Sequence, residues 1–375
     1  MKHGAKRKHK AGRRHSWRPL ALIAVVSVAA IVGILAVIRP DPNPDVQHNA
    51  SNAKDAAPMR IGYVPYWDQD RAFAVVDQNP ELFDEISPMW YAPEANGDVR
   101  LADTEETVID LPAVRALQEQ GIRVIPTVTN LRDGDWDPAV VQALLHDPAA
   151  MRRHVDALVD LAVSEGYDGI DIDYEELGGA DRDAYSEFLT SLGTALRSAG
   201  KALTTAVHPK TSDAGYDERN LAQDFAAIGA AADQVRVMTY DYSWDTSPPG
   251  PVAPADWVED VIAWTVTQIP AEKVILGIVL LGYDWGDGPG ATVDYEQLQE
   301  IADHHDAIVR RSDDRSPSFR YRGPSNTLHE VWYEDAASVR AKLPLVSEYG
   351  LGGAFFWRLG GEDPRVWPTV REMLD

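Results

Sequence analysis

The chain has 375 residues, of which 45% are hydrophobic and 25% are charged, so it is long enough to bury a large core. It contains no cysteine, which excludes disulfide bonds, thiolate metal sites and cysteine nucleophiles. Residues 1–39 carry nine Lys or Arg and no acidic residue, whereas residues 40–375 carry a net charge of −33. So acidic a surface argues against nucleic acid as a partner, because phosphate binding needs clustered cations.

The first patterned segment is a run of 19 uncharged, almost wholly apolar residues at positions 20–38. A helix of this length nearly matches the hydrocarbon core of a membrane. Eight Lys or Arg precede the run and only Arg39 follows it directly, so residues 1–18 are predicted to be a basic cytoplasmic segment. We therefore expect a transmembrane signal anchor at 19–39, in a single-pass protein of the cell membrane with residues 40–375 outside the cytoplasm.

A cleaved signal peptide, which would make the protein secreted, is the alternative interpretation. Signal peptides have shorter apolar regions, of about 7–15 residues, followed by a pair of small residues. The run here is longer, and Ile38-Arg39-Pro40 is a poor cleavage site. Residues 40–58 are rich in Pro, Asn, Asp and Ala and are predicted to form a flexible linker.

Residues 59–375 alternate between β-branched or aromatic runs and amphipathic helical stretches. Helical stretches such as 149–165 and 183–199 lie between eight predicted strands, at 60–66, 86–91, 124–129, 169–174, 203–207, 235–240, 274–280 and 353–356. Strands that alternate with helices indicate a parallel sheet, and eight of them indicate a closed barrel. The expected fold class is α/β, a (β/α)8 TIM barrel over 59–375.

The seventh and eighth predicted strands are separated by about seventy residues, far more than the other pairs. Within this stretch, 318–321 and 328–333 are predicted to form a β pair, and a helix is expected around 335–343. We interpret residues 290–345 as a small α+β insertion at the rim of the barrel.

The fourth predicted strand carries three alternating acids, Asp171, Asp173 and Glu175. Alternate side chains of a strand share a face, so these three should line the barrel interior, roughly 6–7 Å apart. Their mutual repulsion should raise the proton affinity of at least one of them. Glu175 comes last, at the strand end where barrel active sites lie, and is therefore the candidate proton donor.

Two alternatives for these acids are a buried hydrogen-bond network without chemistry and a metal site. An EF-hand loop starting at Asp171 would need Gly at its sixth position, where the chain has Glu176. No His stands within the motif to complete a transition-metal site. We expect neither a metal nor a cofactor.

The motif Asp168-Gly-Ile-Asp171-Ile-Asp173-Tyr-Glu175 resembles the signature of glycoside hydrolase family 18, which includes chitinases. Met238-Thr-Tyr240-Asp241 is similar to the family's Met-x-Tyr-Asp, and Trp357 to the tryptophan that ends its eighth strand. Segments 209–212, 250–254, 282–285 and 329–335 resemble the spore-germination, cortex-lytic branch. The chain departs from many chitinases at 126–130, where Pro-Thr-Val-Thr-Asn replaces a Ser-x-Gly-Gly motif.

The resemblance implies retaining, substrate-assisted hydrolysis of β-1,4-linked N-acetylglucosamine polymers, either peptidoglycan or chitin and chitooligosaccharides. Glu175 would be the catalytic acid, and Asp173 would orient the substrate's acetamido group. Asp171 would share a proton with Asp173. Tyr240 would hydrogen-bond the acetamido group, and Asp241 would contact the sugar or the acid.

Six of the 11 tryptophans fall at or just after the ends of predicted strands: Trp67, Trp90, Trp136, Trp244, Trp285 and Trp357. Aromatic rings pack on sugar faces and the indole N–H can bond a hydroxyl, so these residues are candidates for binding a polysaccharide. The family places Trp357 beneath the scissile sugar. Trp257 is expected to lie in the core. His208, after the fifth strand, is a candidate pocket residue or a structural one.

The alternative functions are a non-catalytic, lectin-like carbohydrate-binding barrel at the cell surface and a purely structural wall protein. Relatives that only bind carbohydrate typically lose the catalytic Glu, and Glu175 is present. Saccharide binding without turnover would favour the lectin-like interpretation. The absence of any saccharide binding would favour the structural one.

Overall fold

The computed structural model describes residues 57–103, 105–132 and 134–375. The expected cytoplasmic segment, signal anchor and most of the linker lie outside these described residues, so those expectations stay predictions. In the described part of the chain, no helix is both long enough and apolar enough to cross a membrane.

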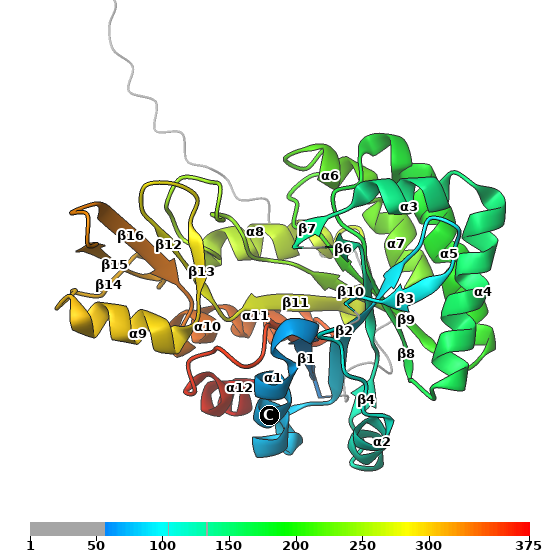
Figure 1. Ribbon diagram of the computed structural model, residues 1–375, viewed down its shortest axis with the longest axis horizontal. Helices are drawn as coiled ribbons and strands as arrows, with labels where there is room; N and C mark the ends of the chain where they lie inside the picture. The colour runs from blue at the N-terminus through cyan, green and yellow to red at the C-terminus, as the bar shows by residue number, and fades with distance from the viewer. Residues whose placement is uncertain (1–56, 104, 133) are drawn as a thin grey trace, which may run out of the picture. The chain divides into compact units, whose positions relative to one another are not determined.

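Eight parallel strands close into a barrel (Figure 1). They are β1 (Met59–Pro65), β2 (Glu85–Pro93), β5 (Thr127–Thr129), β8 (Gly169–Asp173), β9 (Ala202–Val207), β10 (Gln234–Val237), β11 (Val274–Val279) and β17 (Gly353–Trp357). The ring closes because β1 pairs with both β2 and β17. The short strand β4 (Arg123–Val124) also pairs with β2, just before β5. The predicted TIM barrel is confirmed.

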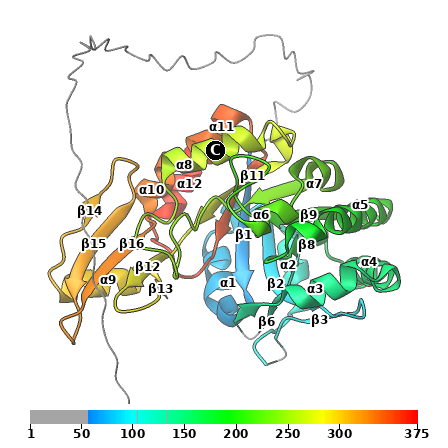
Figure 2. The ribbon, with the colours of Figure 1, turned by 90° about the horizontal axis from the view of Figure 1, so that it is seen from above.

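Helices form an outer layer around these strands, as Figure 2 shows from above. They are α1 (Gln69–Gln78), α2 (Leu111–Glu119), α3 (Pro138–Leu145), α4 (Pro148–Ser164), α5 (Arg182–Ser198), α6 (Glu218–Ala222), α7 (Phe225–Ala231), α8 (Ala255–Thr265), α10 (Ala336–Lys342), α11 (Pro344–Tyr349) and α12 (Val366–Leu374). Several begin at an aspartate followed closely by proline: Asp110, Asp137 and Asp147 each accept a hydrogen bond from a backbone N–H of the first turn. This combination favours a helix start, because it satisfies free N–H groups and fixes φ.

The main core lies between the barrel strands and the helices. On β8 and the residue after it, Ile170, Ile172 and Tyr174 are buried in this core. The acids that alternate with them face the other way, into the barrel. The alternation therefore separates an apolar outer face of the strand from a polar inner face, as the sequence predicts.

A second, five-stranded antiparallel sheet lies at one side of the barrel (Figures 1 and 2). Its strands are β12 (Gly282–Trp285), β13 (Ala291–Val293), β14 (Arg310–Arg311), β15 (Pro317–Arg322) and β16 (Leu328–Tyr333), with α9 (Tyr295–His304) between β13 and β14. Phe319, Val331 and Leu298 belong to its own small apolar core. The predicted α+β insertion is present between the seventh and eighth barrel strands.

The insertion begins and ends earlier than the predicted range 290–345. It starts at Gly282, because β12 pairs antiparallel with β16 over forty residues further along the chain. It ends at Tyr333, and α10 and α11 return to the outer layer of the barrel. Three short strands border the barrel mouth: β3 (Val99–Leu101) pairs antiparallel with the end of β2, and β6 (Leu131–Arg132) forms a hairpin with β7 (Asp135–Trp136).

Candidate active site

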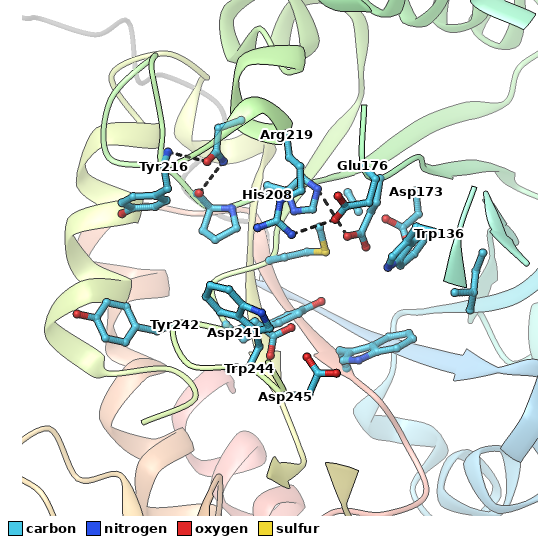
Figure 3. Close-up of a pocket in the computed structure, with 18 of the residues that line it drawn as sticks. Trp136, Asp173, Glu176, His208, Tyr216, Arg219, Asp241, Tyr242, Trp244 and Asp245 are labelled. Carbon is cyan, nitrogen blue, oxygen red and sulfur yellow. Dashed lines mark hydrogen bonds and ion pairs between the residues drawn. The ribbon is translucent and has the colours of Figure 1, made fainter. Parts of the chain in front are cut away.

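A cavity of about 1080 Å³ opens at the ends of the barrel strands (Figure 3). Most of the predicted site residues line it: Asp173, Glu175, Tyr240, Asp241, Trp67, Trp244 and Trp357. They come from β1, β8, β10 and β17 or from the loops that follow these strands. Because parallel strands end at the same edge of a barrel, residues far apart in the chain meet here.

Asp171 lies beneath the cavity and is completely buried. Its Oδ2 accepts hydrogen bonds from the hydroxyls of Tyr63 (2.8 Å) and Thr127 (2.9 Å), and its Oδ1 accepts one from Thr204 (2.6 Å). Arg236 Nη1 lies 3.4 Å from Oδ1. Three hydroxyl donors and a cation together compensate the burial of a carboxylate.

Asp173 is 6% exposed and reaches the cavity floor. Burial and, to a lesser extent, the charge of Asp171 raise its pKa to about 8, although Arg236 opposes both effects. Oδ1 of Asp173 is buried without a hydrogen-bond partner among the described residues. The proton that Asp171 and Asp173 were expected to share therefore stays a prediction. The site thus contains an acid with a raised pKa whose Oδ1 has no partner among the described residues.

Glu175 is held by its backbone rather than by its side chain. Asn130 Oδ1 accepts a hydrogen bond from the Glu175 N–H (2.9 Å), and Asn130 Nδ2 donates one to the Glu175 carbonyl (3.0 Å). The carboxyl group faces the cavity. Burial raises its pKa well above the ordinary value, Asp173 and Asp241 add to the rise, and Arg219 opposes it. A carboxyl group that keeps its proton near neutral pH is suited to general acid catalysis.

Tyr240 and Asp241 follow β10 and form the opposite wall. Tyr240 is buried and packs edge-on against Phe355 at 6.1 Å, and burial raises the pKa of its hydroxyl well above the ordinary value. Asp241 has a positive φ of 57° and accepts a hydrogen bond from the Tyr283 hydroxyl at 2.9 Å. The cavity walls limit the solvation of its charge and raise its pKa to about 6, although the bond from Tyr283 opposes this.

Aromatic rings line the rest of the cavity. Every strongly exposed aromatic side chain of the described residues lies there: Trp67, Tyr216, Tyr242 and Trp244. Trp357 meets Tyr63 and Trp67 edge-on, at 5.7 and 6.3 Å. Exposed aromatic faces are costly in water unless a ligand covers them, and sugar rings are suitable ligands.

Two predicted substrate-binding residues, Trp90 and Trp285, do not line the cavity. Trp90 is 1% exposed, packs against Phe73, and donates its indole N–H to Gln69 at 3.2 Å. Trp285 is 4% exposed and donates to the backbone carbonyl of Trp244 at 3.3 Å. Position at a strand end was not sufficient, because the side chains of both residues turn into the protein and support their neighbours.

Trp257, which was expected in the core, packs against it and also lines the cavity, where its indole donates to the Tyr216 hydroxyl at 3.0 Å. Sequence reasoning also missed an ion-pair group beside Glu175. Arg219, on α6, bonds Glu176 at 3.0 Å and Asp217 at 2.6 Å (Figure 3). Glu176 and Asp217 both lie within hydrogen-bonding distance of Arg219, so its positive charge is already balanced. No sequence motif marked the group, since Glu176 follows β8 whereas Asp217 and Arg219 lie at the start of α6.

Among the described residues, no group of three His, Cys, Asp or Glu side chains has the arrangement to hold a metal ion. Of the two acids of β8, Asp171 is instead bonded to three hydroxyls and lies beside Arg236.

The family model for glycosyl hydrolases family 18 matches residues 60–362. The chain belongs to this family. Family 18 relatives include the cortical fragment-lytic enzyme of Bacillus subtilis, 34% identical over 71% of this chain and 63% of the relative. The chain thus spans somewhat less than two thirds of that protein.

Solved structures of family 18 members share the fold. A chitinase from Chromobacterium violaceum is 30% identical, with a TM-score of 0.79 over 85% of this chain and 99% of its own. The spore cortex-lytic enzyme SleL of Bacillus cereus is 26% identical, with a TM-score of 0.76 over 85% of this chain and 74% of its own. Family membership and the acid-containing cavity identify the chain as a glycoside hydrolase.

Proposed function

We propose that the protein is a retaining, substrate-assisted hydrolase of β-1,4-linked N-acetylglucosamine polymers. The observation that carries the proposal is the pairing of two acids at the cavity floor. Glu175 has a strongly raised pKa, and neighbouring Asp173 has a buried Oδ1 with no hydrogen-bond partner in the part of the chain that the structure describes. An acetamido N–H of the substrate would supply the missing partner, which links the site to 2-acetamido sugars.

In the first step, Glu175 would give its proton to the glycosidic oxygen while the acetamido oxygen of the substrate attacks the anomeric carbon. The bond from that carbon to the glycosidic oxygen breaks, and the leaving sugar departs as an alcohol. An oxazolinium ion remains, and Asp173 would bond its N–H and stabilise the positive charge. Tyr240 would hydrogen-bond the acetamido group from the other side. Water then attacks the anomeric carbon and opens the oxazolinium ring. Glu175 takes a proton from this water, and configuration is retained.

Peptidoglycan is our first candidate substrate. It is supported by the similarity to a cortical fragment-lytic enzyme and a spore cortex-lytic enzyme, and by the anchor expected at 19–39, which would hold the barrel outside the membrane. Chitin and chitooligosaccharides are the second candidate, supported by the likeness to the Chromobacterium violaceum chitinase over nearly all of that protein.

The experiment compares the full chain, purified in detergent, with its Glu175→Gln variant. Each is incubated with purified peptidoglycan and with chitooligosaccharides, and the products are identified by mass spectrometry. We expect reducing N-acetylglucosamine ends from the wild type only, because the amide cannot give a proton to the glycosidic oxygen. Retained saccharide binding without any product from the wild type would favour the lectin-like alternative.

A further inference from the structure

His208 is the first residue after β9, and its imidazole lines the cavity beside the proton donor. Its Nε2 lies 3.6 Å from Glu175 Oε2. Figure 3 shows the ring between Arg219 and the acids at the end of β8. The proposed mechanism gives this residue no task, yet it is among the groups nearest to the catalytic carboxyl group.

The loop that carries His208 is firmly held. The His208 N–H donates to Gln223 Oε1 at 2.8 Å, and the carbonyl of Pro209 accepts from Asn220 at 3.0 Å. The next residue, Lys210, is completely buried and donates to the backbone carbonyls of Asn220 and Gln223 at 3.2 and 2.6 Å. These bonds fix the backbone that carries the imidazole. A group that orients a catalytic side chain needs such a fixed position.

The Nε2 atom itself is left unpaired. It is buried and has no hydrogen-bond partner among the residues that the structure describes, and the whole residue is 8% exposed. Buried polar atoms are nearly always paired, so an unpaired one in an active site calls for a functional explanation. The nearby Glu175 oxygen lies just beyond hydrogen-bonding distance, and a small rotation of either side chain would close the gap.

The imidazole is uncharged at ordinary pH. Burial and, to a lesser extent, the charge of Arg219 lower its pKa to about 3, although Asp217 opposes both effects. Glu175 in turn faces Asp173, Asp241 and Glu176, which raise its pKa, and Arg219, which lowers it. A neutral imidazole next to a protonated carboxyl group can accept a hydrogen bond through its bare nitrogen.

We propose that His208 is a positioning residue whose neutral Nε2 accepts the hydrogen bond of the protonated Glu175 side chain in the free enzyme. The inference rests on the proposed function, because it takes Glu175 as the proton donor. The bond keeps the proton on Glu175 until a glycosidic oxygen replaces the imidazole as its acceptor. After proton transfer, the nitrogen lone pair faces a carboxylate and makes it a stronger base toward the water of the second step.

The test compares His208→Phe, which keeps a ring but removes the acceptor, with His208→Gln, which offers a carbonyl oxygen. The pH dependence of kcat/KM reports ionisations of the free enzyme, and that of kcat reports those of the enzyme–substrate complex. On chitooligosaccharides, we expect His208→Phe to move the alkaline limb of kcat/KM down by about one pH unit, since one hydrogen bond changes a proton affinity about tenfold. The alkaline limb of kcat should move much less. In His208→Gln, the limb of kcat/KM should return most of the way to its wild-type position.

A second readout does not depend on turnover. The carboxyl stretch of Glu175 can be titrated by infrared difference spectroscopy, with each protein measured against the same protein carrying Glu175→Gln. We expect a lower Glu175 pKa in His208→Phe and a recovered one in His208→Gln. His305→Phe, a histidine substitution in the insertion, is the matched control and should leave the titration unchanged.

An unchanged Glu175 pKa in His208→Phe would overturn the proposal and leave His208 a structural role. A higher pKa would overturn it as well, because it would mean that the imidazole donates rather than accepts. If the wild type cleaved no glycan, the proposed function would fail, while the infrared titration would still decide the role of His208.

Discussion

Arg236 Nη1 lies 3.4 Å from Asp171 Oδ1, and both side chains are completely buried inside the barrel. The same guanidinium group donates to Ser87 at 2.6 Å and to the buried carboxylate of Glu85. The layer beneath the active site is therefore an ion-pair network rather than the branched apolar residues typical of barrel interiors. It places a fixed positive charge below the catalytic acids, where it moderates the rise in the pKa of Asp173.

Removing this cation should destabilise the protein strongly. We expect Arg236→Met to lower the free energy of unfolding by about 3–5 kcal/mol, because the buried carboxyl groups of Glu85 and Asp171 then lose the fully buried cation that they share. Urea unfolding followed by circular dichroism measures the effect. The double variant Arg236→Met/Glu85→Met should recover much of the loss. Equal stability of the single variant and the wild type would contradict the prediction.

Asp173 should make stability depend on pH. Its folded-state pKa of about 8 lies above the ordinary value of 3.8. Between these values the folded protein keeps a proton that the unfolded chain loses, so this group's contribution to stability falls as pH rises, by about 1.4 kcal/mol per unit at most. Below pH 3.8 the group is protonated in both the folded and the unfolded state. Above about pH 8 it is ionised in both, and its destabilising contribution no longer changes with pH.

Asp173→Asn cannot ionise and should escape this penalty. Its stability relative to the wild type should therefore rise between about pH 4 and pH 8 and then level off, as urea unfolding across that range would show. A stability difference that does not change with pH would mean that Asp173 has the same proton affinity in both states.

The same substitution separates binding from catalysis. Asp173→Asn should lower turnover by about 10²-fold or more while changing oligosaccharide affinity little, because the contact to the acetamido group strengthens as positive charge develops. Calorimetry would give the affinity, and product analysis would give the rate. Equal losses in both would assign Asp173 to ground-state binding.

Trp244 and Trp90 form a matched pair, one exposed in the cavity and one buried outside it. Trp244→Ala should weaken oligosaccharide binding about tenfold at nearly unchanged stability, because it removes a sugar-binding face. Trp90→Ala should instead cost about 3–5 kcal/mol of stability through the cavity it leaves. Calorimetric binding and urea unfolding of both variants test the assignment, and reversed effects would refute it.

The barrel was predictable because each strand is a short apolar run bounded by helices, and these local patterns determine the secondary structure. The predicted strand 235–240 was too long: β10 ends at Val237, and the chain then turns into the cavity wall. The start of the insertion at Gly282 could not be predicted, because it depends on a pairing with Tyr333 that no local pattern marks.

The acids of β8 were predictable, since alternation alone separates their face from that of the apolar residues. The direction of a tryptophan side chain at a strand end was not predictable, and this is why Trp90 and Trp285 were wrongly expected to bind substrate. Asn130 escaped notice for a different reason. Its amide spans the backbone of Glu175 from the neighbouring strand, a contact that appears only when β5 and β8 pair.

Gly282 and Tyr333, the two ends of the insertion, face each other across a pair of antiparallel strands. The chain thus leaves the barrel and rejoins it at almost the same point, so the segment between them can be shortened or exchanged without altering the path of the barrel strands. Joining Gly282 to Tyr333 by a short turn would remove the insertion and leave a minimal barrel. Segments transplanted from relatives at the same two positions would yield chimaeras in which the side wall of the cleft changes and the proton-transfer groups stay in place.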